Sequence, residues 1–204
     1  MKVTSLDYDH HLKTDIALKV PVMRKKSFAD MPCPIALSLE HVGDWWNILI
    51  LRDLSYGLSR FDEFQKSLGI ASSTLTRRLN DLIESGLIER RAYTDKPTRY
   101  DYLLTERGRD FRQVVLTLMK FGNKHFSGER SNIELFDENT GQAVDVVLTD
   151  GNTGKRINMR EHSLRYKGPA QSLSAWRLET GRPRRDAYRN SLPVTPSQPL
   201  QTHR

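Results

Sequence analysis

Residues 60–86 read RFDEFQKSLGIASSTLTRRLNDLIESG and contain two segments of helical periodicity separated by a short turn. The apolar residues of the first segment recur at helical spacing: Phe61, Phe64 and Leu68. Those of the second segment share one face: Leu75, Leu79, Leu82 and Ile83. Gly69 and Gly86 follow the two segments and mark their ends, and we expect Ser72 or Ser73 to cap the second helix. The pattern predicts two helices joined by a tight turn, which is a helix-turn-helix unit.

The sequence upstream of this unit predicts two more helices. Pro34 suits the first turn of a short apolar helix, because its missing N–H would have no partner there, and Gly43 ends that helix. Asp44 can cap the next helix, residues 45–54, which is apolar on nearly every side. Such a helix belongs at the buried centre of a domain, and Gly57 ends it.

The sequence downstream predicts a hairpin and a long helix. Residues 87–93 and 100–104 have the composition of two short strands, and the polar residues 94–99 join them with a proline at the tip. Thr105 then caps a long helix with many apolar residues. Helices followed by a capped helix and a β-hairpin make an α+β fold of the winged helix-turn-helix type.

The outer face of the second helix in the pair carries side chains suited to reading DNA. Arg77 could bind guanine through two hydrogen bonds, and Asn80 could bind adenine. The first turn offers free backbone N–H groups and the positive end of the helix dipole to a phosphate, and a basic hairpin tip could enter the minor groove. The predicted DNA contacts are Ser72, Ser73, Thr74, Thr76, Arg77, Arg78, Asn80, Lys96 and Arg99.

These residues and their neighbours resemble the HxlR-type family of bacterial transcriptional regulators, which are relatives of the MarR-type regulators. The resemblance spans residues 24–126 and rests on residues 27–36, 43–46, 49–53, 60–64, 68–71, 86–90 and 99–102, with Leu75, Arg78, Leu79, Leu82, Pro97, Leu104, Thr105 and Gly108. It implies a homodimer that binds pseudo-palindromic double-stranded DNA near a promoter, usually as a repressor. The alternative is a winged helix that binds proteins without specific DNA binding.

The apolar residues of the long helix exceed what a two-stranded wing can cover, which predicts a dimer interface. The first apolar helix offers a second surface of suitable length. The predicted interface residues are Ile35, Leu39, Phe111, Val114, Val115, Leu118 and Met119. The alternative is that the long helix packs within the protomer, on the C-terminal hairpin.

The net charge of +7 is concentrated at the C-terminus, because residues 155–204 alone carry a net charge of +8. We expect four segments along the 204 residues. They are a flexible extension (1–23), the winged helix domain (24–126), a small β-hairpin unit (127–168) and a disordered basic tail (169–204). Met23 is a candidate internal start, which would leave residues 1–22 outside the protein.

The hairpin unit, with expected strands at 143–148 and 155–159, resembles a zinc ribbon without its cysteines. Thr140-Gly141 and Thr153-Gly154 stand where Cys-Gly knuckles would fall, so we expect no metal and no cofactor. Cys33 is the one cysteine, at the entrance of a helix whose dipole can lower a thiol pKa. The resemblance makes Cys33 a candidate redox sensor, and the alternative is a small buried residue near the dimer interface.

Several function classes are excluded by what the sequence lacks. It contains no HExxH, GxSxG, P-loop or GxGxxG motif, so we expect no enzyme. It has no apolar run near the roughly 20 residues of a membrane span, and no signal peptide. A single cysteine is typical of a reducing compartment, and we therefore expect a cytoplasmic protein that acts on the nucleoid, with any effector still to be identified.

Overall fold

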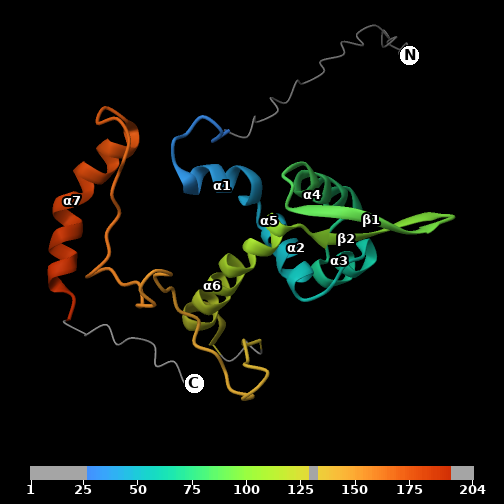
Figure 1. The fold of residues 1–204 in the computed structure, drawn as a ribbon. Helices are drawn as coiled ribbons and strands as arrows, with labels where there is room; N and C mark the ends of the chain where they lie inside the picture. The colour runs from blue at the N-terminus through green and yellow to red at the C-terminus, as the bar shows by residue number, and fades with distance from the viewer. Residues whose placement is uncertain (1–26, 129–132, 194–204) are drawn as a thin grey trace, which may run out of the picture.

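The computed structural model describes residues 27–128 and 133–193. It shows a helical bundle that carries a long two-stranded hairpin on one side and an extended C-terminal segment on the other (Figure 1). The predictions for residues 1–23, including the alternative start at Met23, lie outside the described residues. No helix within the described ranges is long and apolar enough to cross a membrane.

The core of the bundle forms around α2 (Trp45–Ser55), as its apolar sequence predicts. Asp44 caps this helix by accepting a hydrogen bond from the Trp46 N–H at 3.0 Å. The helices α1 (Pro34–Val42), α3 (Phe61–Leu68) and α4 (Ser72–Glu84) pack around it. The largest fully buried side chains come from α2, α3, α4 and the first strand: Ile50, Leu51, Asp53, Phe64, Leu75, Leu79, Leu82 and Ile88.

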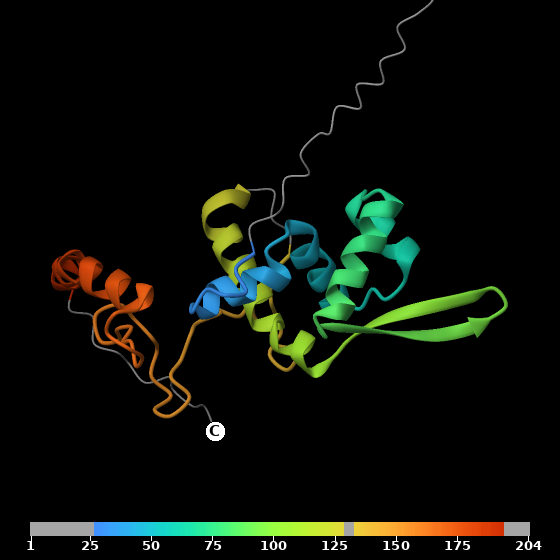
Figure 2. The ribbon, with the colours of Figure 1, turned by 90° about the horizontal axis from the view of Figure 1, so that it is seen from above.

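The wing consists of β1 (Ile88–Asp95) and β2 (Thr98–Leu104), which pair antiparallel. Its loop is only Lys96-Pro97, shorter than the predicted tip, because Thr94 and Thr98 continue the strands and their hydroxyls donate to the Pro97 and Asp95 carbonyls. The hairpin extends well beyond the helices in Figure 2.

The predicted long helix after Thr105 is interrupted, which corrects the sequence prediction. Thr105 caps α5 (Glu106–Asp110) as expected, by accepting from the Gly108 N–H at 3.2 Å. The helix breaks at Phe111, and α6 (Arg112–Gly122) and the π-helical turn η1 (Asn123–Ser127) follow. Gly108 is tightly packed, since a Cβ there would lie 2.0 Å from the Leu87 carbonyl oxygen. Docking of α5 on the end of β1 therefore takes precedence over a continuous helix.

The expected β-hairpin unit is instead a pair of tight turns, and the predicted strands at 143–148 and 155–159 reduce to two isolated bridges, Phe136↔Ala143 and Thr149↔Arg156. The turns repeat the sequence Asp-x-Asn-Thr-Gly, at residues 137–141 and 150–154. Their glycines adopt positive φ values of 64° and 66°. A backbone N–H from Thr140 lowers the pKa of Asp137, and the Thr153 hydroxyl does the same for Asp150. Local side-chain bonds hold these turns, so strand pairing is not needed.

The predicted disordered tail contains a long helix, α7 (Leu173–Ser191), which corrects the prediction for residues 169–193. Ser172 caps it by accepting from the Ala175 N–H at 3.1 Å. Pro183 lies inside the helix, and the proline and arginine content suggested disorder. The helix is supported by local pairs on successive turns, Arg182 with Glu179 at 2.6 Å and Arg189 with Asp186 at 3.4 Å.

Candidate nucleic-acid interface

The helix α4 presents a polar face to solvent. Its apolar side chains are buried, and Thr74 is half-buried at the border. The exposed side chains include five of the predicted DNA contacts: Ser72, Ser73, Thr76, Arg77 and Asn80. The pattern follows from the helical period, because positions 75, 79 and 82 share the face that meets α2 and α3. Hydroxyl, guanidinium and amide groups are thus brought together on one exposed surface.

The turn between α3 and α4 is fixed by a side-chain bond. Gln65 Nε2 donates to Ser72 Oγ over 2.7 Å, which ties the end of α3 to the start of α4. Ser72 is therefore the first residue of the helix, and Ala71, rather than a serine, is the N-cap. Alanine has no side-chain acceptor, so the first-turn N–H groups have no side-chain cap among the described residues. An anion such as a DNA phosphate can bind these groups.

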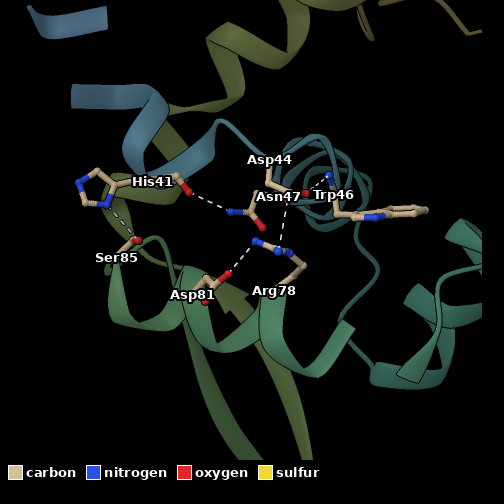
Figure 3. A network of polar contacts seen from close by, with 7 residues as sticks. All are labelled: His41, Asp44, Trp46, Asn47, Arg78, Asp81 and Ser85. Atoms are coloured by element: carbon tan, nitrogen blue, oxygen red, sulfur yellow. Dashed lines mark hydrogen bonds and ion pairs between the residues drawn. The ribbon is translucent and has the colours of Figure 1, made fainter. Parts of the chain in front are cut away.

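Arg78 does not lie on the exposed face, and its assignment as a DNA contact is corrected. Its side chain is only 13% exposed and points back toward α2. There its guanidinium pairs with Asp44 at 3.3 Å and with Asp81 at 2.8 Å (Figure 3). Two carboxylates bind the arginine inside the protomer, so its role is to hold α4 on α2.

The same polar network reaches α1 (Figure 3). The buried Asn47 donates through Nδ2 to the His41 carbonyl oxygen at 2.9 Å. His41 Nδ1 lies 3.1 Å from Ser85 Oγ, at the end of α4. Residues on α1, α2 and α4 therefore hold the exposed polar face of α4 in place through specific polar contacts as well as apolar packing.

The wing carries its predicted basic residues in exposed positions. Lys96 lies at the tip and Arg99 near the start of β2, and both residues are exposed. Neither has an ion pair among the described residues. Both cations are thus available for phosphates or the minor groove.

Arg60 is a further cation at this surface that sequence reasoning missed. It pairs through an isolated β-bridge with Asp101 of β2, and its guanidinium lies 4.6 Å from the Tyr93 ring centroid. Arg60 and Arg99 line one hollow of about 520 Å³ with three tyrosines, Tyr93, Tyr100 and Tyr102. Arg60 precedes α3, far from the wing in sequence, so no local motif signals its position there.

The predicted dimer residues divide into two groups. Ile35, Leu39, Val114 and Leu118 are exposed, with Ile35 at 71%, and Met119 is half-buried. Val115 is buried and Phe111 packs against the protomer core, so these two assignments are corrected. They fill space inside the protomer because α6 packs against α2. Phe121 of α6, one of the apolar residues of the predicted long helix, is also exposed, at 53%. Trp45 of α2, which sequence reasoning did not assign to the interface, is 73% exposed.

Cys33 is the N-cap of α1 and is half-buried. The backbone N–H of Ala36 lowers the pKa of its thiol, and this effect is partly opposed by burial. The Arg177 charge on α7 adds a smaller lowering effect. The position favours thiolate formation, as its place at a helix start predicts.

The C-terminal turns hold no metal-ligand set. No group of three or more His, Cys, Asp or Glu side chains comes together within residues 27–128 and 133–193. Lys120 of α6 donates to the Asp145 carboxylate and, at 2.5 Å, to the Val146 carbonyl. These contacts attach the first turn to α6.

Comparison with known proteins identifies relatives of the winged domain. A family profile described as HxlR-like helix-turn-helix matches residues 41–130. An uncharacterised HTH-type transcriptional regulator of Mycobacterium tuberculosis is 36% identical over 127 residues, which are 62% of this chain and 80% of the relative. YdeP of Bacillus subtilis, also an uncharacterised HTH-type regulator, is 35% identical over 94 residues, 46% of this chain and 73% of the relative.

Two solved structures share the fold. PA1607, provisionally assigned as a transcription factor, is 30% identical with a TM-score of 0.62, over 70% of this chain and 100% of its own. PA1374 of Pseudomonas aeruginosa, with the same provisional assignment, is 42% identical with a TM-score of 0.50, over 72% of this chain and 100% of its own. The similarity to both structures extends beyond half of the chain.

Proposed function

The chain belongs to the HxlR-like helix-turn-helix family of transcriptional regulators, and from this premise we propose that it is a homodimeric repressor that binds a pseudo-palindromic operator. The polar face of α4 carries the proposal, because it is exposed while Arg78 and the apolar residues hold its other side. The protein would act on chromosomal DNA in the cytoplasm, and repression would follow from occupying a promoter.

Sequence reading is assigned to three side chains of α4. Arg77 and Asn80 would hydrogen-bond to base edges in the major groove, with Ser73 beside them. The first turn of α4 would bind a backbone phosphate through its N–H groups. Arg99 and Lys96 of the wing would lie along the adjacent minor groove, and Arg60 would contact the backbone at the base of the wing.

The homodimer is supported by exposed apolar residues on α1 and α6: Ile35, Leu39, Val114, Leu118, Met119 and Phe121. Large apolar side chains are costly to leave in water, and their concentration on two helices favours an interface. Two-fold pairing through it would present two α4 helices to one face of a duplex, with half-sites about 34–36 Å apart. Cys33 precedes α1 and would sense oxidants or electrophiles from a position beside this interface.

A protein-binding winged helix is the second candidate, and charge favours it. Residues 27–128 contain 14 basic and 13 acidic side chains, which is nearly neutral for a DNA-binding unit. Specific duplex binding with steep salt dependence distinguishes the regulator from this alternative.

The test is selection of a duplex by the purified protein from a random library, followed by footprinting and titration. We expect protection of two half-sites by wild type. Arg77→Ala and Asn80→Ala should each weaken binding to the selected duplex by about 1–3 kcal/mol and relax the preference at one base pair. Glu84→Gln, also exposed on α4, is the matched control and should bind as wild type. Failure to enrich any sequence would reject the proposed function.

A further inference from the structure

We infer that α7 and the segment before it form a second DNA contact, which binds the phosphate backbone without reading sequence; this rests on the proposed function. The starting observation is an imbalance of charge. The winged unit is nearly neutral, whereas residues 155–193 hold ten basic and three acidic side chains. A protein that binds DNA needs cations that displace counterions from phosphates, and the C-terminal segment is where this chain carries them.

The helix α7 is held against the rest of the protein at its start. Ser174 Oγ donates to the Pro32 carbonyl oxygen at 2.8 Å, and Arg177 contacts the sulfur of Met31 at 3.8 Å. Ala175, between them in the chain, is buried. Residues 31–32 lead directly into α1, so α7 is attached beside the proposed dimer surface.

A basic groove lies between α7 and residues 163–170. It has a volume of about 710 Å³, and four arginines line it: Arg165, Arg182, Arg185 and Arg189. The carboxylates in its wall, Glu179 and Asp186, each have an arginine partner one turn away on α7. The acids are therefore neutralised, and the groove keeps an excess of guanidinium groups, which suit phosphate oxygens.

Two of the four groove arginines form no ion pair with a residue of the described segments. They are Arg165, which is exposed, and Arg185, which is half-buried. Arginines held at close spacing on a helix repel each other, and a polyanion relieves that repulsion. A duplex supplies phosphates at regular spacing along a length that matches a 19-residue helix.

The position of α7 relative to the wing suits a long ligand such as a DNA duplex. Figures 1 and 2 both show α7 and the wing at opposite ends of the molecule, with α1 and α6 between them. In a dimer formed through α1 and α6, α7 of one protomer would lie toward the half-site of its partner. Attachment at a second point raises the effective concentration of the first, so a neutral reading head can still bind well.

The test is the salt dependence of duplex binding by the full-length protein. In the variant Arg165→Gln/Arg185→Gln two cations that line the groove, and that form no ion pair among the described residues, are removed. The matched control Arg112→Gln/Lys124→Gln removes two exposed cations from α6 and the turn after it. Binding to the selected duplex and to a shuffled duplex is measured by fluorescence anisotropy from 50 to 300 mM salt, with circular dichroism and sedimentation to check folding and assembly.

We expect the C-terminal variant to weaken binding to both duplexes, while its preference for the selected duplex is unchanged. Its log–log salt slope should be flatter by about 0.9 for each phosphate that the protein no longer neutralises. The control should keep the wild-type slope.

Equal slopes for variant and control would overturn this inference and leave the proposed function intact. Equal binding of selected and shuffled duplexes by wild type would instead reject the proposed function. If the C-terminal variant binds an acidic peptide less well than wild type does, while its binding to DNA is unchanged, the surface belongs to a protein partner and the inference is overturned.

Discussion

Arg78 Nη2 lies 3.3 Å from Asp44 Oδ2, and this ion pair joins the recognition helix to the N-cap of the central helix. Asp44 has two tasks, because its other oxygen caps α2 by accepting from the Trp46 N–H. The orientation of α4, and with it the position of Arg77 and Asn80, therefore depends on an ion pair that is largely buried inside the protomer.

The first prediction separates these adjacent arginines. Arg78→Ala should lower the free energy of unfolding by about 1–3 kcal/mol, because two carboxylates lose their partner in a partly buried site. Arg77→Ala should change stability by less than about 0.5 kcal/mol, as is usual for an exposed position. Urea denaturation measures both. The structural role of Arg78 is refuted if the two variants are equally stable.

The face of α4 could be predicted from sequence, because burial of Leu75, Leu79 and Leu82 leaves the opposite positions exposed. The inward turn of Arg78 could not, since its partner Asp44 belongs to another helix and helical spacing alone places position 78 near the border. The position of Arg60 beside the wing has the same origin, because it depends on a bridge between segments distant in sequence.

For the C-terminal segment the prediction of disorder, which rested on composition, was wrong, whereas local sequence signals indicate a helix. Pro183 and the many arginines suggested disorder, although Ser172 at the cap and acidic residues three positions before Arg182 and Arg189 support a helix. In residues 133–160 the sequence predicts turns at Gly141 and Gly154, which the structure confirms, but it does not predict the side-chain bonds of Asp137 and Asp150 that hold them. The turns could therefore be located from sequence, whereas the strand pairing could not, because the bridges here involve single residue pairs.

The second prediction concerns self-association. Leu118 of α6 is 45% exposed, so Leu118→Asp places a charge in the proposed interface without opening a cavity in the protomer. We expect this variant to sediment as a monomer at micromolar concentration, where wild type sediments as a dimer. Leu148→Asp, at a position that is 59% exposed in the C-terminal turns, is the control and should remain dimeric. A dimeric Leu118→Asp protein would exclude this face of α6 from the interface.

The third prediction concerns the wing. Arg99→Ala should weaken binding to the selected duplex and flatten its log–log salt slope by about 0.9, because one phosphate-neutralising cation is removed. Arg60→Ala should have a similar effect if both cations in the hollow contact the backbone. Anisotropy titrations at several salt concentrations measure both, with Lys124→Ala as a control. Unchanged slopes for both variants would place this hollow away from DNA.

The fourth prediction concerns the titration of Cys33. The Ala36 N–H lowers the pKa of its thiol. The rate at which iodoacetamide alkylates the folded protein should therefore rise with pH, and the midpoint of that rise should lie below the pKa of about 8.5 for an unperturbed cysteine. Because folding lowers this pKa, the linked stabilisation is fully present above the unfolded value and is lost as pH falls through the folded one. Arg177→Gln should raise the midpoint slightly, since its charge is the smaller cause.

If Cys33 also senses oxidants, diamide should release wild type from the selected duplex through an intersubunit disulfide or a small-thiol adduct, and Cys33→Ser should remain bound. Non-reducing electrophoresis and mass spectrometry identify the product. A lowered midpoint together with equal DNA affinity of wild type and Cys33→Ser under diamide would mean that the helix start activates the thiol without coupling it to α4.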